Sequence, residues 1–177
     1  MNSKVIVVTG ASSGIGLEIA KKAQANGESV VWCSRNIHEN EEVKSLINDQ
    51  STFYSLDVAS EESVKGLFDF VKSRYRRLDV LINCAGYVNP EPLLMTDLEN
   101  WNSTIGVNLT GTFLCSKYGS LLMKATGGKI INIASTAGLT PRPGWSAYAA
   151  AKSGVINFSY AIAEELSPYN IKVFIIC

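Results

Sequence analysis

The sequence lacks the features that mark membrane proteins, nucleic-acid-binding proteins and histidine-dependent metal proteins. No apolar run approaches the roughly 20 residues that a membrane-spanning helix requires. The 16 basic and 16 acidic side chains balance, so no excess of positive charge attracts nucleic acid or an anionic membrane. His38 is the only histidine among 177 residues, which argues against a histidine-based metal centre or hydrolase. We therefore expect no metal, no nucleic acid and no membrane as a partner.

Cysteines are also sparse and scattered. The four, Cys33, Cys84, Cys115 and Cys177, form no C-x-x-C pair. Three of them fall in apolar runs, so reduced core thiols are a simpler interpretation than disulfides or metal ligands. The first apolar run, at residues 5–8, is too short for a signal peptide and leads straight into a glycine-containing turn. These absences predict a soluble cytoplasmic protein.

Short β-branched runs alternate with longer helical patterns along the chain. Repeated strand–helix–strand units predict an α/β fold, a doubly wound parallel sheet with right-handed crossovers and strand order 3-2-1-4-5-6. The expected strands are nearly continuous apolar runs, as when helices cover both faces. We expect strands at Lys4–Thr9, Ser29–Ser34, Thr52–Asp57, Asp79–Asn83, Lys129–Ala134 and Ile171–Cys177. We expect helices at Gly14–Asn26, Glu39–Asp49, after Ser60, at Leu98–Ala125 and at Ser146–Leu166.

A glycine-rich turn joins the first strand to the first helix. Its sequence, Thr9–Gly16, has the spacing Gly-x-x-x-Gly-x-Gly. Such glycines permit a tight turn and let a pyrophosphate approach backbone N–H groups at a helix N-terminus. The position of this turn predicts a dinucleotide-binding domain of Rossmann type spanning residues 1–177. The expected cofactor contacts are Gly10, Ser12, Ser13, Gly14, Ile15 and Gly16.

The end of the second strand distinguishes between the two nicotinamide cofactors. An acidic residue there would accept from the ribose 2′-hydroxyl and repel a 2′-phosphate. This chain has Ser34 and Arg35 instead, and a guanidinium can bind a phosphate through two hydrogen bonds and stack on adenine. We therefore predict that NADP(H) is preferred over NAD(H). The alternative is that Arg35 is a solvated surface charge.

Two further strand ends are predicted to complete the cofactor site. Asp57 and Val58 end the third strand, where the carboxylate could accept from the adenine amino group or cap the next helix. The fourth strand ends in Asn83-Cys84-Ala85-Gly86. Small residues there leave room for a flat ring and a ribose, so Asn83, Ala85 and Gly86 are candidate contacts, although a simple turn would have the same sequence.

Tyr148 and Lys152 are the candidate catalytic pair. They stand one helical turn apart, so both side chains project from one helix face. An ammonium beside a phenol favours the phenolate and lowers its pKa, which makes the pair a general acid/base for alcohol–carbonyl chemistry. Ser135, at the end of an apolar run, could hydrogen-bond the reacting oxygen.

With these motifs in this order, the chain resembles the short-chain dehydrogenase/reductase family over nearly its whole length. The resemblance rests on Thr9–Gly16, Asn83–Gly86, Asn108 within Val107-Asn108-Leu109, Ser135, and Tyr148-x-x-x-Lys152. It implies a catalytic tetrad and NAD(P)-dependent interconversion of a carbonyl and an alcohol. Tyr148 would then exchange the proton, and Ser135 would hold the oxygen. Lys152 would bind the nicotinamide ribose, and Asn108 a relay water.

The resemblance also implies where this chain departs from its family. Members usually run to roughly 250 residues, the size of a complete α/β domain, and continue into a further helix and a seventh strand. Because these elements are absent here, we interpret the chain as a C-terminally incomplete domain. A 3-oxoacyl-thioester reductase of fatty-acid synthesis and a non-catalytic nucleotide-binding fragment are alternative functions. A small, apolar substrate is expected, as is a homodimer through the 98–125 and 146–166 helices.

Overall fold

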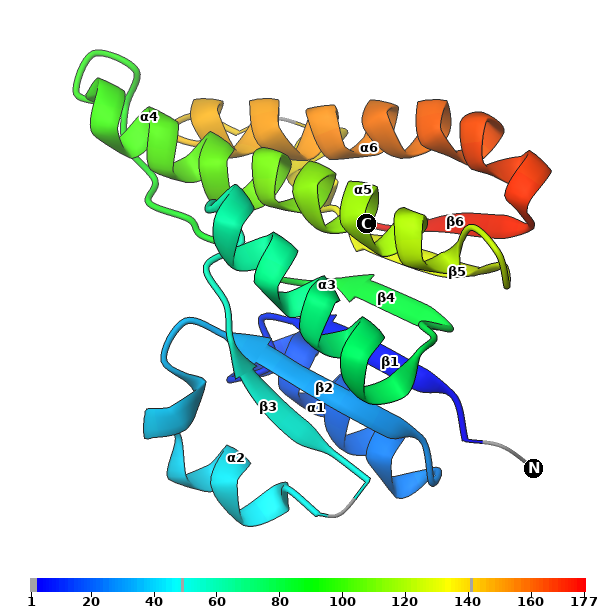
Figure 1. Ribbon diagram of the computed structural model, residues 1–177. Helices are drawn as coiled ribbons and strands as arrows, with labels where there is room; N and C mark the ends of the chain where they lie inside the picture. Colours follow the sequence, from blue (N-terminus) through cyan, green and yellow to red (C-terminus); the bar gives the residue numbers. More distant parts are fainter. Residues whose placement is uncertain (1–2, 49, 141) are drawn as a thin grey trace.

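The computed structural model describes residues 3–48, 50–140 and 142–177. Its centre is a six-stranded sheet of order β3-β2-β1-β4-β5-β6 (Figure 1). Every neighbouring pair is parallel, which confirms the predicted doubly wound sheet and its strand order. The strands are β1 (Val5–Thr9), β2 (Ser29–Ser34), β3 (Thr52–Ser55), β4 (Val80–Asn83), β5 (Gly128–Ile133) and β6 (Ile171–Ile176).

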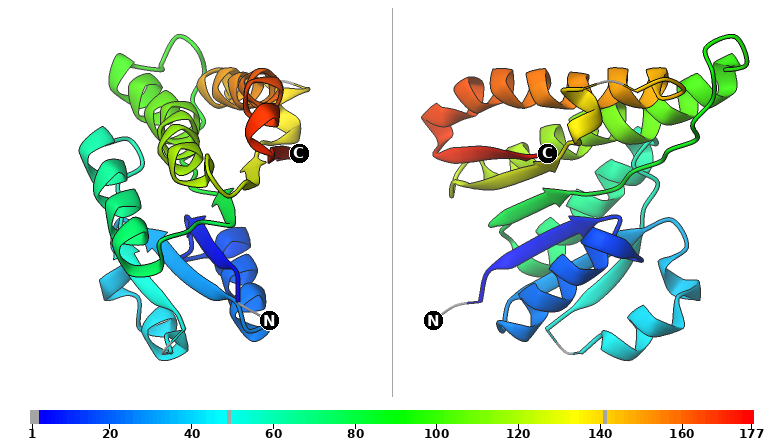
Figure 2. Two further views of the ribbon diagram at one scale, coloured as in Figure 1. Left: turned by 45° about the vertical axis from the view of Figure 1, so that its right-hand side comes forward. Right: turned by 180° about the vertical axis from the view of Figure 1, so that it is seen from behind.

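Helices cover the sheet on both sides, with α1 and α2 on one face and α3, α5 and α6 on the other (Figure 2). Among the described residues, no helix has the length and hydrophobicity needed to cross a bilayer. The helices are α1 (Gly14–Ala25), α2 (Glu41–Leu46), α3 (Glu61–Tyr75), α4 (Leu98–Ile105), α5 (Gly111–Met123) and α6 (Ser146–Leu166).

The predicted helix over Glu39–Asp49 is wrong in its extent. A 3₁₀ turn at Ile37–Glu39 precedes a helix of six residues, α2. Asn40 separates them because its side chain caps α2, accepting from the backbone N–H of Val43 at 3.0 Å. The helix ends where Ile47 becomes extended, and Asp49 lies outside the described residues.

The predicted helix over residues 98–125 contains an irregularity. Between α4 and α5 the backbone forms a π turn at Gly106–Thr110, which widens one turn of an otherwise continuous helix. Such turns occur often at functional sites, and this one holds Asn108. The apolar periodicity of the sequence gives no indication of this π turn.

The hydroxyl of Thr9 joins the ends of β1 and β4. It accepts from the backbone N–H groups of Cys84 and Ala85, both at 3.0 Å, and donates to the carbonyl of Ile82 at 3.4 Å. Since β1 and β4 are neighbours at the point where the strand order reverses, this contact fixes the position at which α/β folds place their ligands.

A buried polar network ties β4 and β5 to two helices. The amide of Asn83 donates to Asn132 at 2.8 Å and to Ser116 of α5 at 3.1 Å. The amide of Asn132 in turn donates to Ser159 of α6 at 2.8 Å. Because all four side chains are buried, these bonds satisfy polar groups that would be costly to leave unpaired. The side-chain oxygen of Asn83 is the exception within the network, since it has no partner among the described residues. The network therefore holds α6 at a fixed height above the sheet.

Candidate functional site

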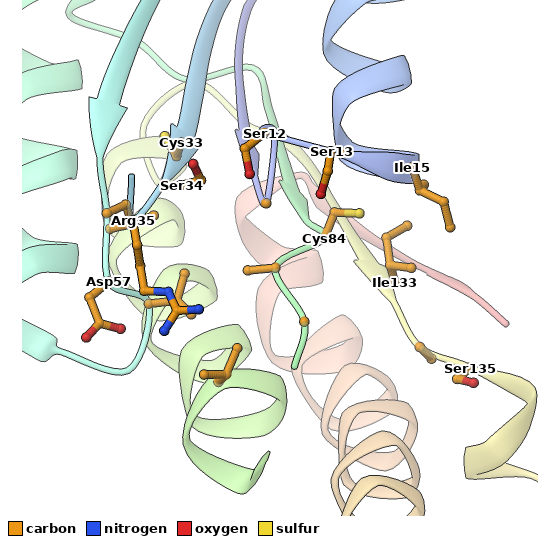
Figure 3. Close-up of a pocket in the computed structure, with 18 of the residues that line it drawn as sticks. Ser12, Ser13, Ile15, Cys33, Ser34, Arg35, Asp57, Cys84, Ile133 and Ser135 are labelled. Carbon is orange, nitrogen blue, oxygen red and sulfur yellow. The ribbon is translucent and has the colours of Figure 1, made fainter. Parts of the chain in front are cut away.

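A cavity of about 1200 Å³ opens at the carboxyl ends of the strands (Figure 3). This is where a doubly wound sheet places its ligand, and the volume exceeds that of ordinary small-molecule pockets. Most of the predicted site residues line it, namely Gly10, Ser12, Ser13, Ile15, Gly16, Ser34, Arg35, Asp57, Val58, Ala85, Gly86, Ser135, Tyr148 and Lys152.

The glycine-rich turn is packed too closely for side chains at two positions. Gly10 has φ +70°, and a Cβ there would lie 2.8 Å from the Cα of Ala85. A Cβ on Gly16 would lie 2.3 Å from the carbonyl oxygen of Gly10. Glycine is required at both positions because the turn packs closely against the segment after β4 and against its own backbone. At Gly10 and Gly16 the turn thus presents backbone to the cavity, while Ser12, Ser13 and Ile15 contribute side chains to its wall.

The glycine-rich turn leads directly into the N-terminus of α1, whose cap and first turn carry no acidic side chain. Ser13 occupies the N-cap position without a side-chain hydrogen bond. The free N–H groups and the positive end of the helix dipole suit an anion. The structure therefore fits the pyrophosphate of a dinucleotide at this end of the cavity.

Arg35 lies at the edge of the cavity that β2 and β3 form. In Figure 3 its guanidinium projects into the cavity beside Asp57, on the side opposite Ser135. Among the described residues, no carboxylate lies within ion-pair distance of Arg35. Asp57 accepts from the N–H of Ala59 at 3.0 Å, a turn contact within its own segment, and lines the cavity wall. The alternative that Asp57 caps the next helix is wrong, because Ser60 is the N-cap of α3 and accepts from the N–H of Ser63.

Lys152 is buried and anchored at the opposite end. Its ammonium donates to the carbonyl of Ile133 at 2.8 Å and lies 5.6 Å from the ring centroid of Tyr148. Burial lowers the pKa of Lys152 to about 8, an effect that the neighbouring Cys84 partly opposes. Burial also raises the pKa of the Cys84 thiol, although the ammonium acts in the other direction.

Tyr148 and Ser135 share this end of the cavity with Lys152. Tyr148 is half-buried in the first turn of α6, and the ring of Trp145 packs edge-on against it at 5.5 Å. Ser135 follows β5, and its hydroxyl accepts from the N–H of Ala137 at 3.1 Å. That bond leaves the hydroxyl proton of Ser135 free to be donated.

Three of the predicted residues, Gly14, Asn83 and Asn108, do not line the cavity. Asn83 lies beneath it in the buried network. The amide of Asn108 donates to the carbonyls of Tyr87, at 2.6 Å, and Thr104, at 2.9 Å. Asn108 thus holds the segment after β4 from behind the cavity wall, and its side-chain donors are fully occupied there.

Sequence reasoning missed other residues of the cavity wall, among them Asn36, Glu39, Asn40, Cys84, Val107 and Ile133. The amide of Asn36 donates to the carboxylate of Glu39 at 3.2 Å. Asn40 precedes two glutamates, a pattern typical of a helix N-cap, but its place at the cavity depends on a contact between distant segments. Ile133 forms part of the cavity wall because it is the last residue of β5, which ends at the cavity.

Comparison with known proteins agrees with this geometry. A family model described as short chain dehydrogenase matches residues 4–177. The chain is 36% identical over 177 residues to an uncharacterized oxidoreductase of Thermotoga maritima, and 37% identical over 178 residues to a 3-oxoacyl-[acyl-carrier-protein] reductase of Synechocystis. Each alignment covers 98% of this chain, and 69% and 72% of the respective relatives.

Solved structures give the same result. A short-chain dehydrogenase from Streptomyces avermitilis superposes with a TM-score of 0.94 at 32% identity, covering 99% of this chain and 65% of the other. A putative short-chain alcohol dehydrogenase from Sinorhizobium meliloti superposes with a TM-score of 0.93 at 30% identity, covering 99% and 71%. The chain therefore spans about two thirds of the length of these proteins, and it belongs to the short-chain dehydrogenase family of oxidoreductases.

Proposed function

We propose that this protein interconverts a carbonyl and an alcohol with a nicotinamide cofactor, working as an NADPH-dependent reductase. The observation that supports this most directly is the shared cavity end of Tyr148, Lys152 and Ser135. A proton donor, a cation and a hydroxyl donor beside one dinucleotide-sized cavity are what reduction of a carbonyl requires. We also propose that residues 1–177 act as a single dinucleotide-binding domain.

The protein's own residues manage the proton in this reaction. NADPH, when bound, supplies the hydride to the carbonyl carbon. Tyr148 donates its phenolic proton to the carbonyl oxygen, so the product is the alcohol and a phenolate remains. The Ser135 hydroxyl donates to the same oxygen and holds it near Tyr148. The Lys152 ammonium stabilises the phenolate and binds the nicotinamide ribose. Asn108 acts indirectly, because its amide holds the segment after β4 that forms part of the cavity wall.

The preference for NADP(H) rests on the far end of the cavity. Arg35 is exposed there, unpaired among the described residues, and aimed into the cavity. Ser34 lies beside it, and no acidic residue occupies the end of β2 itself. A 2′-phosphate there would gain the guanidinium as a partner, whereas a bare ribose would leave it unused.

A narrower candidate is the reduction of a 3-oxoacyl thioester. It is favoured by the names of two relatives, the Synechocystis reductase and a 3-oxoacyl-[acyl-carrier-protein] reductase of Haemophilus influenzae at 32% identity. D-threitol dehydrogenase of Mycolicibacterium smegmatis, at 34% identity, indicates how widely substrates vary among relatives. The alternative from another class is a protein that binds NADPH without turnover.

We further propose that the chain forms a homodimer through the 98–125 and 146–166 helices. These helices lie side by side along one layer (Figures 1 and 2). Phe113 of α5 packs edge-on against Phe158 of α6, and Leu121 is 63% exposed. The four cysteines are free, which accords with the proposed cytoplasmic, reducing compartment.

The first prediction concerns the proton donor. Tyr148→Phe should lower kcat for NADPH-dependent reduction of a carbonyl panel by at least about a hundredfold, since it removes the general acid, while NADPH still binds. Steady-state rates and fluorescence titration would measure the two effects. Tyr169→Phe, which removes a phenol outside the cavity, should leave both unchanged. Tight NADPH binding by the native chain, without turnover of any carbonyl, would favour the non-catalytic alternative.

The second prediction follows from the lowered pKa of Lys152. A lysine with a pKa of about 8 is charged below that pH and neutral above it. We expect kcat/KM for reduction to fall as pH rises through this range, because the ammonium that supports Tyr148 is lost. Lys152→Arg keeps the charge and should move the decline to higher pH in rate profiles between pH 6 and 10. Identical declines in the two proteins would assign the titration to another group.

The third prediction concerns the cofactor preference. Arg35→Ala should weaken NADPH binding about 10- to 100-fold, the usual effect of losing a charge-assisted hydrogen bond, and leave NADH binding nearly unchanged. Dissociation constants from titration calorimetry would show this. Arg74→Ala, on the exposed surface of α3, serves as the matched control. A native preference for NADH that Arg35→Ala does not alter would refute the assignment.

The fourth prediction concerns assembly. Light scattering coupled to size exclusion should give a mass twice that of the chain. Leu121→Glu should shift it toward the single-chain mass, because it places a charge on the proposed apolar interface. Lys172→Glu on β6 is the control, with no shift expected. A monomeric native protein at tens of micromolar would exclude the proposed dimer.

A further inference from the structure

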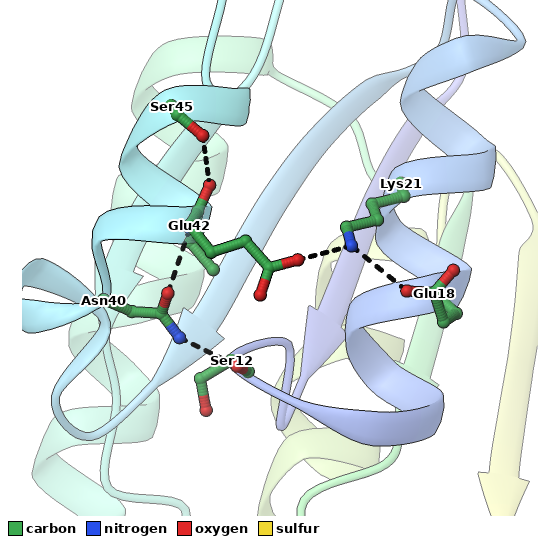
Figure 4. Close-up of polar contacts among 7 residues, drawn as sticks. Ser12, Glu18, Lys21, Asn40, Glu42 and Ser45 are labelled. Carbon is green, nitrogen blue, oxygen red and sulfur yellow. Dashed lines mark hydrogen bonds and ion pairs between the residues drawn. The ribbon is translucent and has the colours of Figure 1, made fainter.

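Asn40 connects two walls of the cavity that are far apart in the sequence. Its amide nitrogen donates to the carbonyl oxygen of Ser12 at 2.8 Å, across 28 positions of the chain (Figure 4). Ser12 belongs to the glycine-rich turn, and Asn40 ends the segment that begins with Arg35. Both residues line the cavity, so this hydrogen bond lies at the edge where the two walls meet.

The same side chain also starts a helix. Its amide oxygen accepts from the backbone N–H of Val43 at 3.0 Å and so caps α2. The two ends of one amide therefore serve two purposes, because the oxygen holds the helix and the nitrogen holds the turn. A serine or an aspartate could replace the first contact, but neither can supply the second donor at that reach.

Other contacts fix the segment on both sides of Asn40. Glu42 of α2 forms an ion pair with Lys21 of α1 at 2.6 Å, and Lys21 also contacts Glu18 at 3.1 Å (Figure 4). The Ile37 side chain is fully buried. Next to the guanidinium, the hydroxyl of Ser55 donates to the Arg35 carbonyl. The N–H of Ala11 in the glycine-rich turn also donates to the carbonyl of Cys33 at 3.0 Å, at the end of β2. The Asn40 bond is thus a second link, on the far side of Arg35, between this anchored segment and the turn.

We infer that Asn40 is a positioning residue for NADP(H) selectivity, an inference that rests on the function proposed above. A cofactor with a 2′-phosphate must contact Arg35 with that phosphate and the glycine-rich turn with its pyrophosphate. Together with the bond from Ala11 to Cys33, the Asn40 bond fixes the separation of these two anion sites before the cofactor arrives. Fixing a site in advance reduces the cost of ordering it on binding. The affinity of a ligand that contacts only one of the two walls does not depend on the Asn40–Ser12 bond.

The test separates the capping contact from the bond to Ser12. Asn40→Ser keeps a good helix cap but loses the donor to Ser12, and Asn40→Asp keeps the cap while placing a carboxylate oxygen against the Ser12 carbonyl. Asn48→Ser, at an exposed position after α2 and outside the cavity wall, is the matched control. The dissociation constants of NADPH, NADH and adenosine 2′-phosphate are measured for each protein, together with the melting temperature.

Asn40→Ser should weaken NADPH binding about three- to tenfold, the usual effect of one lost hydrogen bond. Adenosine 2′-phosphate, which reaches Arg35 but not the glycine-rich turn, should bind within about twofold of the native affinity. Asn40→Asp should weaken NADPH further, because its charge lies near the 2′-phosphate site. The preference for NADPH over NADH should fall in both variants and stay constant in Asn48→Ser.

Two results would overturn the inference. Native NADPH affinity in both Asn40 variants would show that the bond to Ser12 does not set the site. Equal weakening of NADPH, NADH and adenosine 2′-phosphate, with a lowered melting temperature, would show a purely structural role. Failure of the native protein to bind NADPH is a different outcome, since it would refute the proposed function itself.

Discussion

The hydroxyl of Thr9 is the contact on which the rest of the site depends. Strands β1 and β4 are neighbours in the sheet, yet their following segments turn in different directions, and this divergence opens the cavity. By accepting from two successive N–H groups after β4, Thr9 keeps that segment close to β1. Gly10 can then approach Ala85 without a side chain between them. The Thr9 hydroxyl and the absence of a Cβ at Gly10 therefore determine how closely the segment after β4 approaches β1 at the base of the cavity.

The groups that suit cofactor anions and the groups proposed to handle the proton lie at opposite ends of the cavity. The N-terminus of α1 and Arg35 lie toward the β2 side, where both suit anions and where solvent weakens any single contact. The Lys152 ammonium lies at the other end, buried beneath Tyr148, where low polarity lowers its pKa and strengthens its effect on a neighbouring phenolate. The buried Asn83–Asn132 network holds α6, and with it Tyr148 and Lys152, at a fixed distance from the sheet.

The strands, the glycine-rich turn and the placing of Tyr148 beside Lys152 could be predicted because each depends on local sequence. The strand order followed from the alternation of strands with helices, which favours a doubly wound sheet. Apolar runs mark the buried strands, and one helical turn separates the two side chains. Other features depend on contacts between distant segments. In the sequence Asn40 has only the pattern of a helix cap, because its contact with Ser12 forms between segments that are far apart in the chain. The predicted helix over Glu39–Asp49 did not take this cap into account. Asn108 was expected at the reacting centre, whereas its amide is bound to Tyr87 behind the wall.

The π turn at Gly106–Thr110 has a consequence for how the chain can change over time. A π turn accommodates about one residue more than an α-helical turn within a single widened turn. Deleting one residue here would restore a regular helix and remove the widened turn that holds Asn108. The Asn108 amide would then leave the carbonyl of Tyr87. Length in this segment is therefore under tighter constraint than residue identity, and insertions or deletions here should be tolerated less well than substitutions on the exposed side of the same helix.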